Sequence, residues 1–146
     1  MCELCDSVGG ELIWQDELCR VVLVADRHYP GFCRVIWAQH VKEMTDLPRA
    51  EREHLMAVVF AVEASVRRVL NPEKINLASL GNMTPHIHWH VIPRWQNDRH
   101  FPNPIWGEAQ RDEQPAVPEK LADGLRNIIH EALQSASNDL HSMRIP

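Results

Sequence analysis

The stretch His86-Ile87-His88-Trp89-His90-Val91-Ile92 places a histidine at every second position. Successive side chains of a β-strand point to opposite faces, so we expect the three histidines on one face and the apolar residues between them on the other. The apolar face is expected to pack beneath a helix. Folding does not require a row of three imidazoles, and we therefore expect the histidine face to be functional.

Two chemistries fit such a row. Neutral imidazoles can bind a metal ion, or one histidine can attack a phosphorus atom covalently while its neighbours bind the charged oxygens. The preceding loop, residues 79–85, contains a glycine and small polar residues but no carboxylate. A hydrolytic metal site needs a carboxylate or another ligand nearby, whereas glycine and small polar residues suit a phosphate. The loop therefore favours phosphate chemistry.

Apolar periodicity defines the elements around this stretch. A helix that Thr45 or Asp46 caps and Asn71-Pro72 ends keeps a 3.6-residue apolar period, and a last helix covers about residues 118–135. Between the last strand and that helix, the proline-rich segment 93–118 is expected to form a long loop. This order of elements predicts an α+β domain with an antiparallel sheet. The predicted strands are Glu11–Trp14, Cys19–Ala25, Phe32–Ala38, Ile75–Leu80 and His86–Ile92.

The composition is that of an ordinary globular domain. The chain has 146 residues, of which 45% are hydrophobic and 24% charged. We place the domain at residues 1–136 and expect a frayed tail over 137–146. The net charge of −5 argues against nucleic-acid binding, which needs a basic surface. We find no apolar run long enough for a membrane span and no signal peptide, and therefore expect a cytoplasmic protein without membrane partners.

The cysteines form two groups with different expectations. Cys19 and Cys33 lie inside apolar runs and are expected to be buried as small hydrophobic residues. Cys2 and Cys5 form a C-x-x-C, which can grip zinc if two further ligands are supplied. A disordered terminus or a redox pair are the alternatives, although no βαβ pattern follows to support the redox function.

The histidine stretch resembles the signature of the histidine-triad (HIT) superfamily of nucleotidyl hydrolases and transferases. That signature is His-φ-His-φ-His-φ-φ, with φ apolar, and residues 86–92 match it at all seven positions. The order of upstream segments is also similar, so the resemblance covers roughly residues 10–95. It implies a sheet of about five antiparallel strands with two flanking helices, and a homodimer. It further implies a purine nucleotide or nucleotide conjugate as substrate, and no cofactor for the chemistry.

The resemblance also implies roles for individual residues. His88, the central residue of the catalytic row of three, would attack the α-phosphorus and form a nucleotidyl-histidine that water resolves. A backbone carbonyl would hold its Nδ1–H and leave Nε2 to attack. His90 would contact the phosphate oxygens. Asn82 stands where members place a side chain near the phosphate.

Three further nucleotide contacts have alternatives. Asp26 would accept hydrogen bonds from the ribose hydroxyls, or it simply starts a turn. Ile13, together with Trp14, would line the base pocket or belong to the core. Arg94 would bind the leaving group or help to cover the sheet. The same choice applies to other residues of the following loop, namely Trp95, Arg99, His100 and Trp106.

Some HIT proteins carry a structural zinc site that joins an N-terminal C-x-x-C to two histidines. Carried over to this sequence, the ligands are Cys2, Cys5, His40 and His86. Such a site would be four-coordinate and closed. A loop histidine that caps a turn is the alternative reading of His40.

The sequence also departs from the family pattern. Phe32 occupies a position where many members have a fourth histidine, Met83 replaces a polar residue of some members, and the loop before the triad is short. These departures raise a second hypothesis, a zinc-stabilised nucleotide-binding regulatory module with little catalysis. A third hypothesis is a metal-dependent hydrolase that uses the three histidines together.

Overall fold

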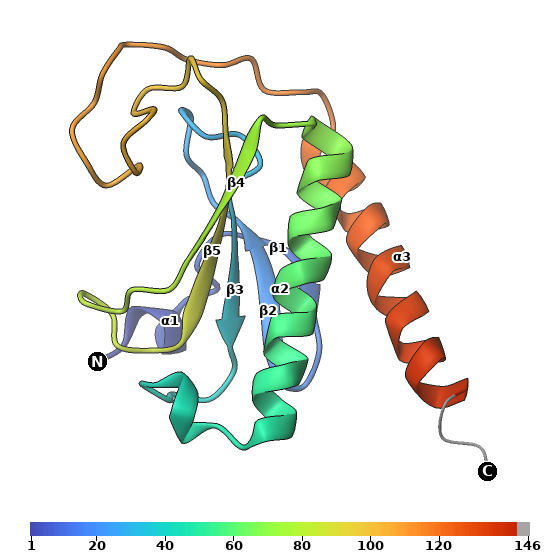
Figure 1. Ribbon diagram of the computed structural model, residues 1–146. Coiled ribbons are helices and arrows are strands. Elements are labelled where there is room, and N and C mark those ends of the chain that lie inside the picture. The colour runs from blue at the N-terminus through green and yellow to red at the C-terminus, as the bar shows by residue number, and fades with distance from the viewer. Residues whose placement is uncertain (143–146) are drawn as a thin grey trace.

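Five antiparallel strands form one sheet in the order β1-β2-β3-β5-β4 in the computed structural model, which describes residues 1–142 and the side chains through residue 134 (Figure 1). The α+β class and the antiparallel sheet are therefore confirmed. The last strand of the sequence lies between the third and the fourth, so the histidine strand has a neighbour on each side. The strands are β1 Glu11–Gln15, β2 Cys19–Leu23, β3 Cys33–Trp37, β4 Lys74–Ala78 and β5 His88–Arg94.

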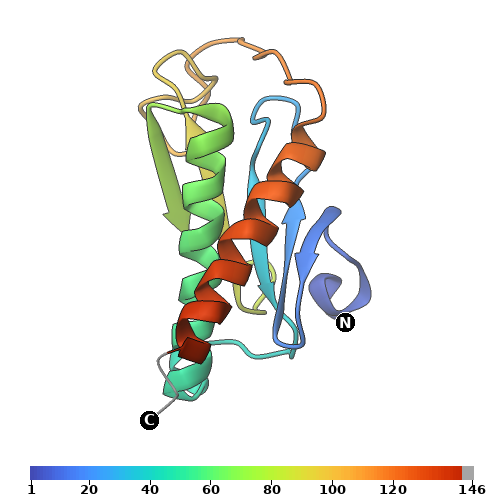
Figure 2. The ribbon, with the colours of Figure 1, turned by 90° about the vertical axis from the view of Figure 1, so that its right-hand side faces the viewer.

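Two long helices, α2 (Arg49–Leu70) and α3 (Leu121–Ser142), lie side by side on one face of the sheet (Figures 1 and 2). Their apolar stripes and the inward residues of the strands form the main core, since apolar residues three or four apart share one helix face. From β5 this core receives Val91, together with Ile87 just before the strand. The helices contribute Leu55, Val58, Val59, Val62, Val66, Leu121, Leu125 and Ile129.

A short helix, α1 (Glu3–Asp6), covers part of the opposite face of the sheet (Figure 1). Its Leu4 is buried against Val22 of β2 and Ile36 of β3. The guanidinium of Arg20 donates to the carbonyl oxygens of Leu4 at 2.7 Å and Ser7 at 3.0 Å, which fixes the helix to the sheet. The sequence did not predict this helix, because four residues are too few to show a helical period.

The observed boundaries differ from the predicted ones where backbone groups are used locally. The strand predicted from His86 begins at His88. Both backbone groups of His86 bond locally, its N–H to the carbonyl oxygen of Thr84 and its carbonyl oxygen to the ring of His88. The last helix extends to Ser142, past the predicted end and into the predicted tail, whose final residues 143–146 lie outside the described part. Within residues 1–142, no helix combines the length and the apolar composition that crossing a membrane requires.

The start of α2 also corrects the prediction. Neither Thr45 nor Asp46 caps the helix; both belong to a 3₁₀ turn, Met44–Asp46, and Pro48 is the N-cap. A proline disfavours the helical region for the residue before it, and Leu47 is accordingly extended, with φ −83° and ψ 142°. At the other end, Asn71 adopts the left-handed conformation and closes the helix.

Candidate functional site

A cleft of about 400 Å³ lies on the face of the sheet opposite α2 and α3, beside the histidines. Strand β5 forms its floor, the loop after β4 forms one wall, and α1 forms the other. Two of the three histidines reach it. Its lining residues are Glu3, Leu4, Arg34, Leu80, Gly81, Asn82, Met83, Thr84, His88, His90 and Trp106.

The ring of His88 is held in one tautomer. Its Nδ1–H donates to the carbonyl oxygen of His86 at 2.6 Å, and because a carbonyl can only accept, Nε2 carries the lone pair. The backbone of His88 is fixed in turn by the hydroxyl of Ser79, which donates to its carbonyl oxygen at 2.9 Å. His88 is 8% exposed in total and lines the cleft. Its arrangement is that of a nucleophile with an unprotonated Nε2.

The ring of His90 is next to that of His88, with centroids 4.9 Å apart. Nε of Arg34, on the neighbouring strand β3, donates to Nδ1 of His90 at 3.5 Å, so the imidazole proton resides on Nε2. Phe32 and Trp106 pack around the ring at centroid distances of 5.6 Å and 5.0 Å. Burial, followed by the neighbouring His88 and Arg34, lowers the pKa of His90 to about 3. His90 is therefore neutral at physiological pH and is a hydrogen-bond donor to a phosphate oxygen through Nε2.

His86 points away from the cleft and toward the N-terminal cysteines. Its Nε2–H donates to the carbonyl oxygen of Trp37 at 2.6 Å, which leaves the lone pair of Nδ1 facing Sγ of Cys2 at 3.5 Å and Sγ of Cys5 at 3.4 Å. The rings of the triad therefore do not converge on one metal ion. This geometry argues against a metal-dependent hydrolase built from all three.

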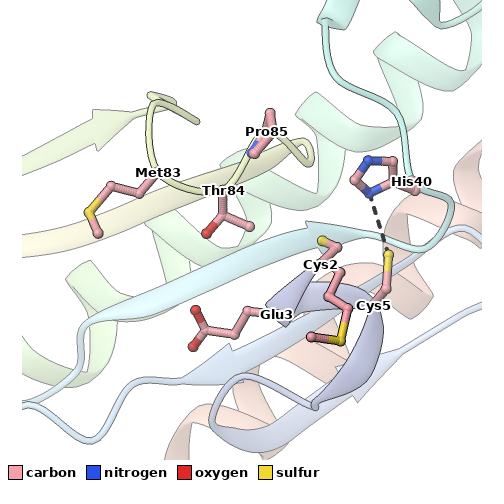
Figure 3. Close-up of a pocket in the computed structure, with 8 residues that line it drawn as sticks. Cys2, Glu3, Cys5, His40, Met83, Thr84 and Pro85 are labelled. Carbon is pink, nitrogen blue, oxygen red and sulfur yellow. Dashed lines mark hydrogen bonds between the residues drawn. The ribbon is translucent and has the colours of Figure 1, made fainter.

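Cys2, Cys5, His40 and His86 nevertheless form a second cluster in which all ligand atoms lie within 4.8 Å of one another. Nδ1 of His40 is 3.5 Å from Sγ of Cys5 (Figure 3). Tetrahedral zinc with bonds of about 2.3 Å to sulfur and about 2.0 Å to nitrogen requires sulfur–nitrogen distances of about 3.5 Å. The hydrogen bond from His86 to a backbone carbonyl is the outer contact that zinc-binding histidines make. The four residues thus fit a closed metal site.

The cleft continues past Glu3, Met83 and Thr84 into a hollow of about 590 Å³ beside this cluster. Figure 3 shows α1, with Glu3, facing the loop that carries Met83 and Thr84. The short helix and its N-cap, Cys2, therefore supply both thiols of the cluster, and the helix forms one wall of the histidine cleft.

Among the nucleotide-binding residues predicted from the sequence, Asn82 lines the cleft, and three others lie elsewhere. Ile13 is 2% exposed and belongs to the core beneath the helices. Asp26 lies in the turn after β2, where its Oδ1 accepts a hydrogen bond from the backbone N–H of His28 at 2.9 Å. Ile13 thus lies in the core and Asp26 in a turn, and these are the alternatives considered for the two positions.

Arg94 is 2% exposed, and its guanidinium bonds inside the protein. It donates to both carboxylate oxygens of Asp98 at 2.7 Å and 3.1 Å, to the side chain of Asn76 at 2.7 Å and to the carbonyl oxygen of Asn103 at 2.7 Å. These bonds use four of the five N–H donors and hold the buried guanidinium away from the cleft. Its role is to fasten the loop after β5 to the sheet.

Sequence reasoning did not single out Arg34. The signal was present, because Arg34 is the one charged residue in the apolar run Phe32–Ala38. Its significance depends on its pairing with His90, and that register between β3 and β5 cannot be read from one sequence. Trp106, for which leaving-group binding and covering of the sheet were both considered, lies at the cleft and against His90.

Comparison with known proteins agrees with this geometry. A HIT domain is matched over residues 8–97. An AP-4-A phosphorylase of Mycobacterium tuberculosis (strain H37Rv) is 27% identical over 128 residues, which cover 84% of this chain and 63% of the relative. A bis(5′-nucleosyl)-tetraphosphatase (asymmetrical) of Schizosaccharomyces pombe is 24% identical over 111 residues, which cover 73% of this chain and 61% of that relative. The chain thus spans less than two thirds of the length of these curated relatives.

Solved structures share the fold. A histidine triad protein from Sinorhizobium meliloti 1021 superposes with a TM-score of 0.70 at 27% identity, covering 90% of this chain and 95% of that one. A zinc-bound histidine triad family protein from Mycobacterium smegmatis gives a TM-score of 0.65 at 23% identity, covering 92% and 96%. With the domain match extending over most of the chain, this protein belongs to the HIT family.

Proposed function

We propose that this protein is a nucleotidyl hydrolase or transferase that acts at the α-phosphate of a purine nucleotide or nucleotide conjugate. The observation that carries the proposal is the tautomer of His88. Its Nδ1–H is engaged by the carbonyl oxygen of His86, so the lone pair of Nε2 is available beside a cleft of about 400 Å³. The names of the M. tuberculosis and S. pombe relatives support a phosphoanhydride substrate.

The proposed reaction has two displacements at phosphorus. Nε2 of His88 forms a bond to the α-phosphorus, and the bond from phosphorus to the leaving group breaks, with its electron pair going to the leaving group. The Nε2–H of His90 donates to a non-bridging oxygen as charge develops there. Water, or another acceptor hydroxyl, then attacks phosphorus, the phosphorus–nitrogen bond breaks, and the acceptor's proton is released as His88 returns to its neutral form.

The test is turnover of purine nucleotide phosphoanhydrides and phosphoramidates by His88→Ala, with His130→Ala as the matched control because His130 is exposed on α3. We expect His88→Ala to lose at least about 10³-fold in kcat, which is the usual scale for a lost nucleophile, and the control to retain the wild-type rate. Rapid quenching of the wild type should trap a chain whose mass is increased by one nucleotidyl group. Full turnover by His88→Ala would refute the proposed role.

The buried Phe32 favours one alternative function. It is 3% exposed and packs on His90 at a position where many HIT proteins carry a fourth histidine. A site without that proton donor suits a nucleotide-binding regulatory module with little catalysis. Tight AMP or GMP binding without turnover on the same substrate panel would select this alternative.

We also propose that Cys2, Cys5, His40 and His86 hold a structural zinc ion. The spacing of their ligand atoms supports this assignment, as does the zinc-bound relative from M. smegmatis. When bound, zinc would fix α1 to the sheet and take no part in phosphoryl transfer. Homodimer formation and a cytoplasmic location remain predictions from the sequence.

A further inference from the structure

The histidine cleft contains an arginine side chain that has no role in the reaction proposed above. Arg34, the second residue of β3, lines the cleft with His88 and His90 and is half-buried. An arginine guanidinium carries five N–H donors and remains charged at any physiological pH. Among the described residues, its recorded hydrogen-bond acceptor is Nδ1 of His90, which takes only the Nε–H. The terminal NH₂ groups have no recorded protein acceptor within the described part of the chain.

Burying half of a guanidinium with no close carboxylate costs free energy, unless a bound ligand supplies the missing negative charge and hydrogen-bond acceptors. Among residues 1–134, whose side chains the structure describes, Arg34 forms no ion pair within 4.0 Å. Its position is nevertheless well defined, because the guanidinium also stacks over the ring of Phe32 at 5.6 Å. Planar guanidinium groups bind the oxygens of a phosphate in pairs. The arrangement is therefore a preformed anion site next to the proposed nucleophile.

The surroundings of His90 indicate which kind of leaving group suits the cleft. Phe32 and the uncharged His90 give the leaving group no acidic proton, so a basic amine would depart with difficulty. A phosphate leaving group needs compensation for negative charge rather than a proton. Arg34 supplies that compensation from within the same cleft.

We propose that Arg34 binds the phosphate beyond the scissile bond and thereby selects substrates with an anionic phosphate leaving group over those with an amine. This inference rests on the proposed function and narrows its substrate class. In the first displacement, the departing phosphate oxygen takes the electron pair of the bond to the α-phosphorus, and the guanidinium of Arg34 pairs with its negative charge. Glu3, exposed on α1, lines the same cleft without an ion pair to Arg34, and its negative charge would weaken the binding of an anion there.

The kinetic test uses two substrates with the same AMP group: ATP, which releases pyrophosphate, and adenosine 5′-phosphoramidate, which releases ammonia. Arg34→Met should reduce kcat/KM for ATP by about 10–100-fold, the scale of a lost charged hydrogen bond, and for the phosphoramidate by less than about 3-fold. Arg68→Met is the charge-matched control, because Arg68 is an exposed residue of α2. Equal losses on both substrates would overturn the proposal, since they would show a general effect on the site.

Calorimetric binding of pyrophosphate separates this inference from the proposed function, because it needs no turnover. Wild type should bind, and Arg34→Met should bind at least about tenfold more weakly. Arg34→Lys keeps the charge but loses the planar pair of donors, so its affinity should lie between those of wild type and Arg34→Met. Glu3→Gln should bind more tightly, since it removes a negative charge from the cleft. Unchanged affinity in Arg34→Met, or no binding by the wild type, would refute the anion site even if His88 proves to be the nucleophile.

Discussion

The chemical character of the two cleft histidines depends on single hydrogen bonds. His88 donates through Nδ1 and keeps Nε2 unprotonated, whereas His90 accepts at Nδ1 and is protonated at Nε2. Two identical residues on one strand face thus become a nucleophile and a donor. The alternating sequence predicts where the rings lie, but not these tautomers. The partner of His88 is the backbone carbonyl of His86, and the partner of His90 is Arg34 on β3.

Acid should destabilise the protein through His90. Burial, together with the neighbouring His88 and Arg34, lowers its pKa in the folded state to about 3, and an unfolded histidine has a pKa of about 6.5. Between these values the unfolded chain binds a proton that the native chain does not, so stability falls as the pH falls through this range. From pH 7 to pH 5, His90 alone should remove about 2 kcal/mol from the free energy of unfolding.

Urea unfolding of wild type and His90→Gln at several pH values measures this contribution. Glutamine places a polar amide group at this position that does not titrate, so the wild type should lose about 2 kcal/mol more than the variant over the same range. Other acid-sensitive groups, including the metal ligands, affect both proteins and cancel in the difference. Parallel curves for the two proteins would show that His90 has an ordinary pKa.

At the level of elements, the strands and long helices follow from the sequence, and the short and irregular segments do not. Alternation and the apolar period predict β1 to β5 and α2 to within a few residues. Helix α1 has too few residues to show a period, and it is held by tertiary contacts of Leu4 and Arg20. The loop after β5 brings Trp106 to His90 through anchors that are recognisable only in three dimensions.

The main anchor of that loop is Asp98, which is 3% exposed. Its carboxylate accepts hydrogen bonds from Arg94 and from backbone N–H groups, including those of Trp95 and Phe101. Burial by itself would raise the pKa of Asp98, but these hydrogen bonds outweigh it and lower the pKa. The pair therefore stays ionised inside the protein and fixes the start of the loop.

Removing this carboxylate should be strongly destabilising. Asp98→Ala leaves the buried guanidinium of Arg94 without its counter-charge, and breaking such a pair costs about 3–5 kcal/mol. Asp112→Ala is the matched control, because this aspartate is 91% exposed and its contact with Arg99 is at the surface. We expect the control to stay within about 0.5 kcal/mol of wild type in urea unfolding. Equal stabilities of the two variants would contradict the anchoring role of Asp98.

For the whole molecule, the decisive feature is that the proposed zinc cluster and the histidine cleft share two parts. His86 supplies a ring nitrogen to the cluster and a carbonyl oxygen to the ring of His88. Helix α1 and its N-cap supply Cys5 and Cys2 to the cluster, and the helix supplies Glu3 to the cleft. The C-x-x-C pointed to Cys2 and Cys5, but His40 and His86 were suggested only by family resemblance, because their positions beside the N-terminus depend on the strand order.

A bound zinc ion would therefore cross-link the N-terminus, the segment after β3 and the segment before β5. A ligand that binds only the folded state adds about 2.7 kcal/mol at one hundred times its Kd. For a domain of this size we expect chelation to lower the Tm by about 5–10 °C.

Cys5→Ser is the suitable comparison, because Cys5 is exposed and its loss removes a ligand without opening the core. The melting temperature of this variant should not respond to the chelator. Elemental analysis of wild type should find one zinc per chain. A wild type that contains no metal and melts at the same temperature with and without chelator would show that α1 is held by Leu4 and Arg20 alone.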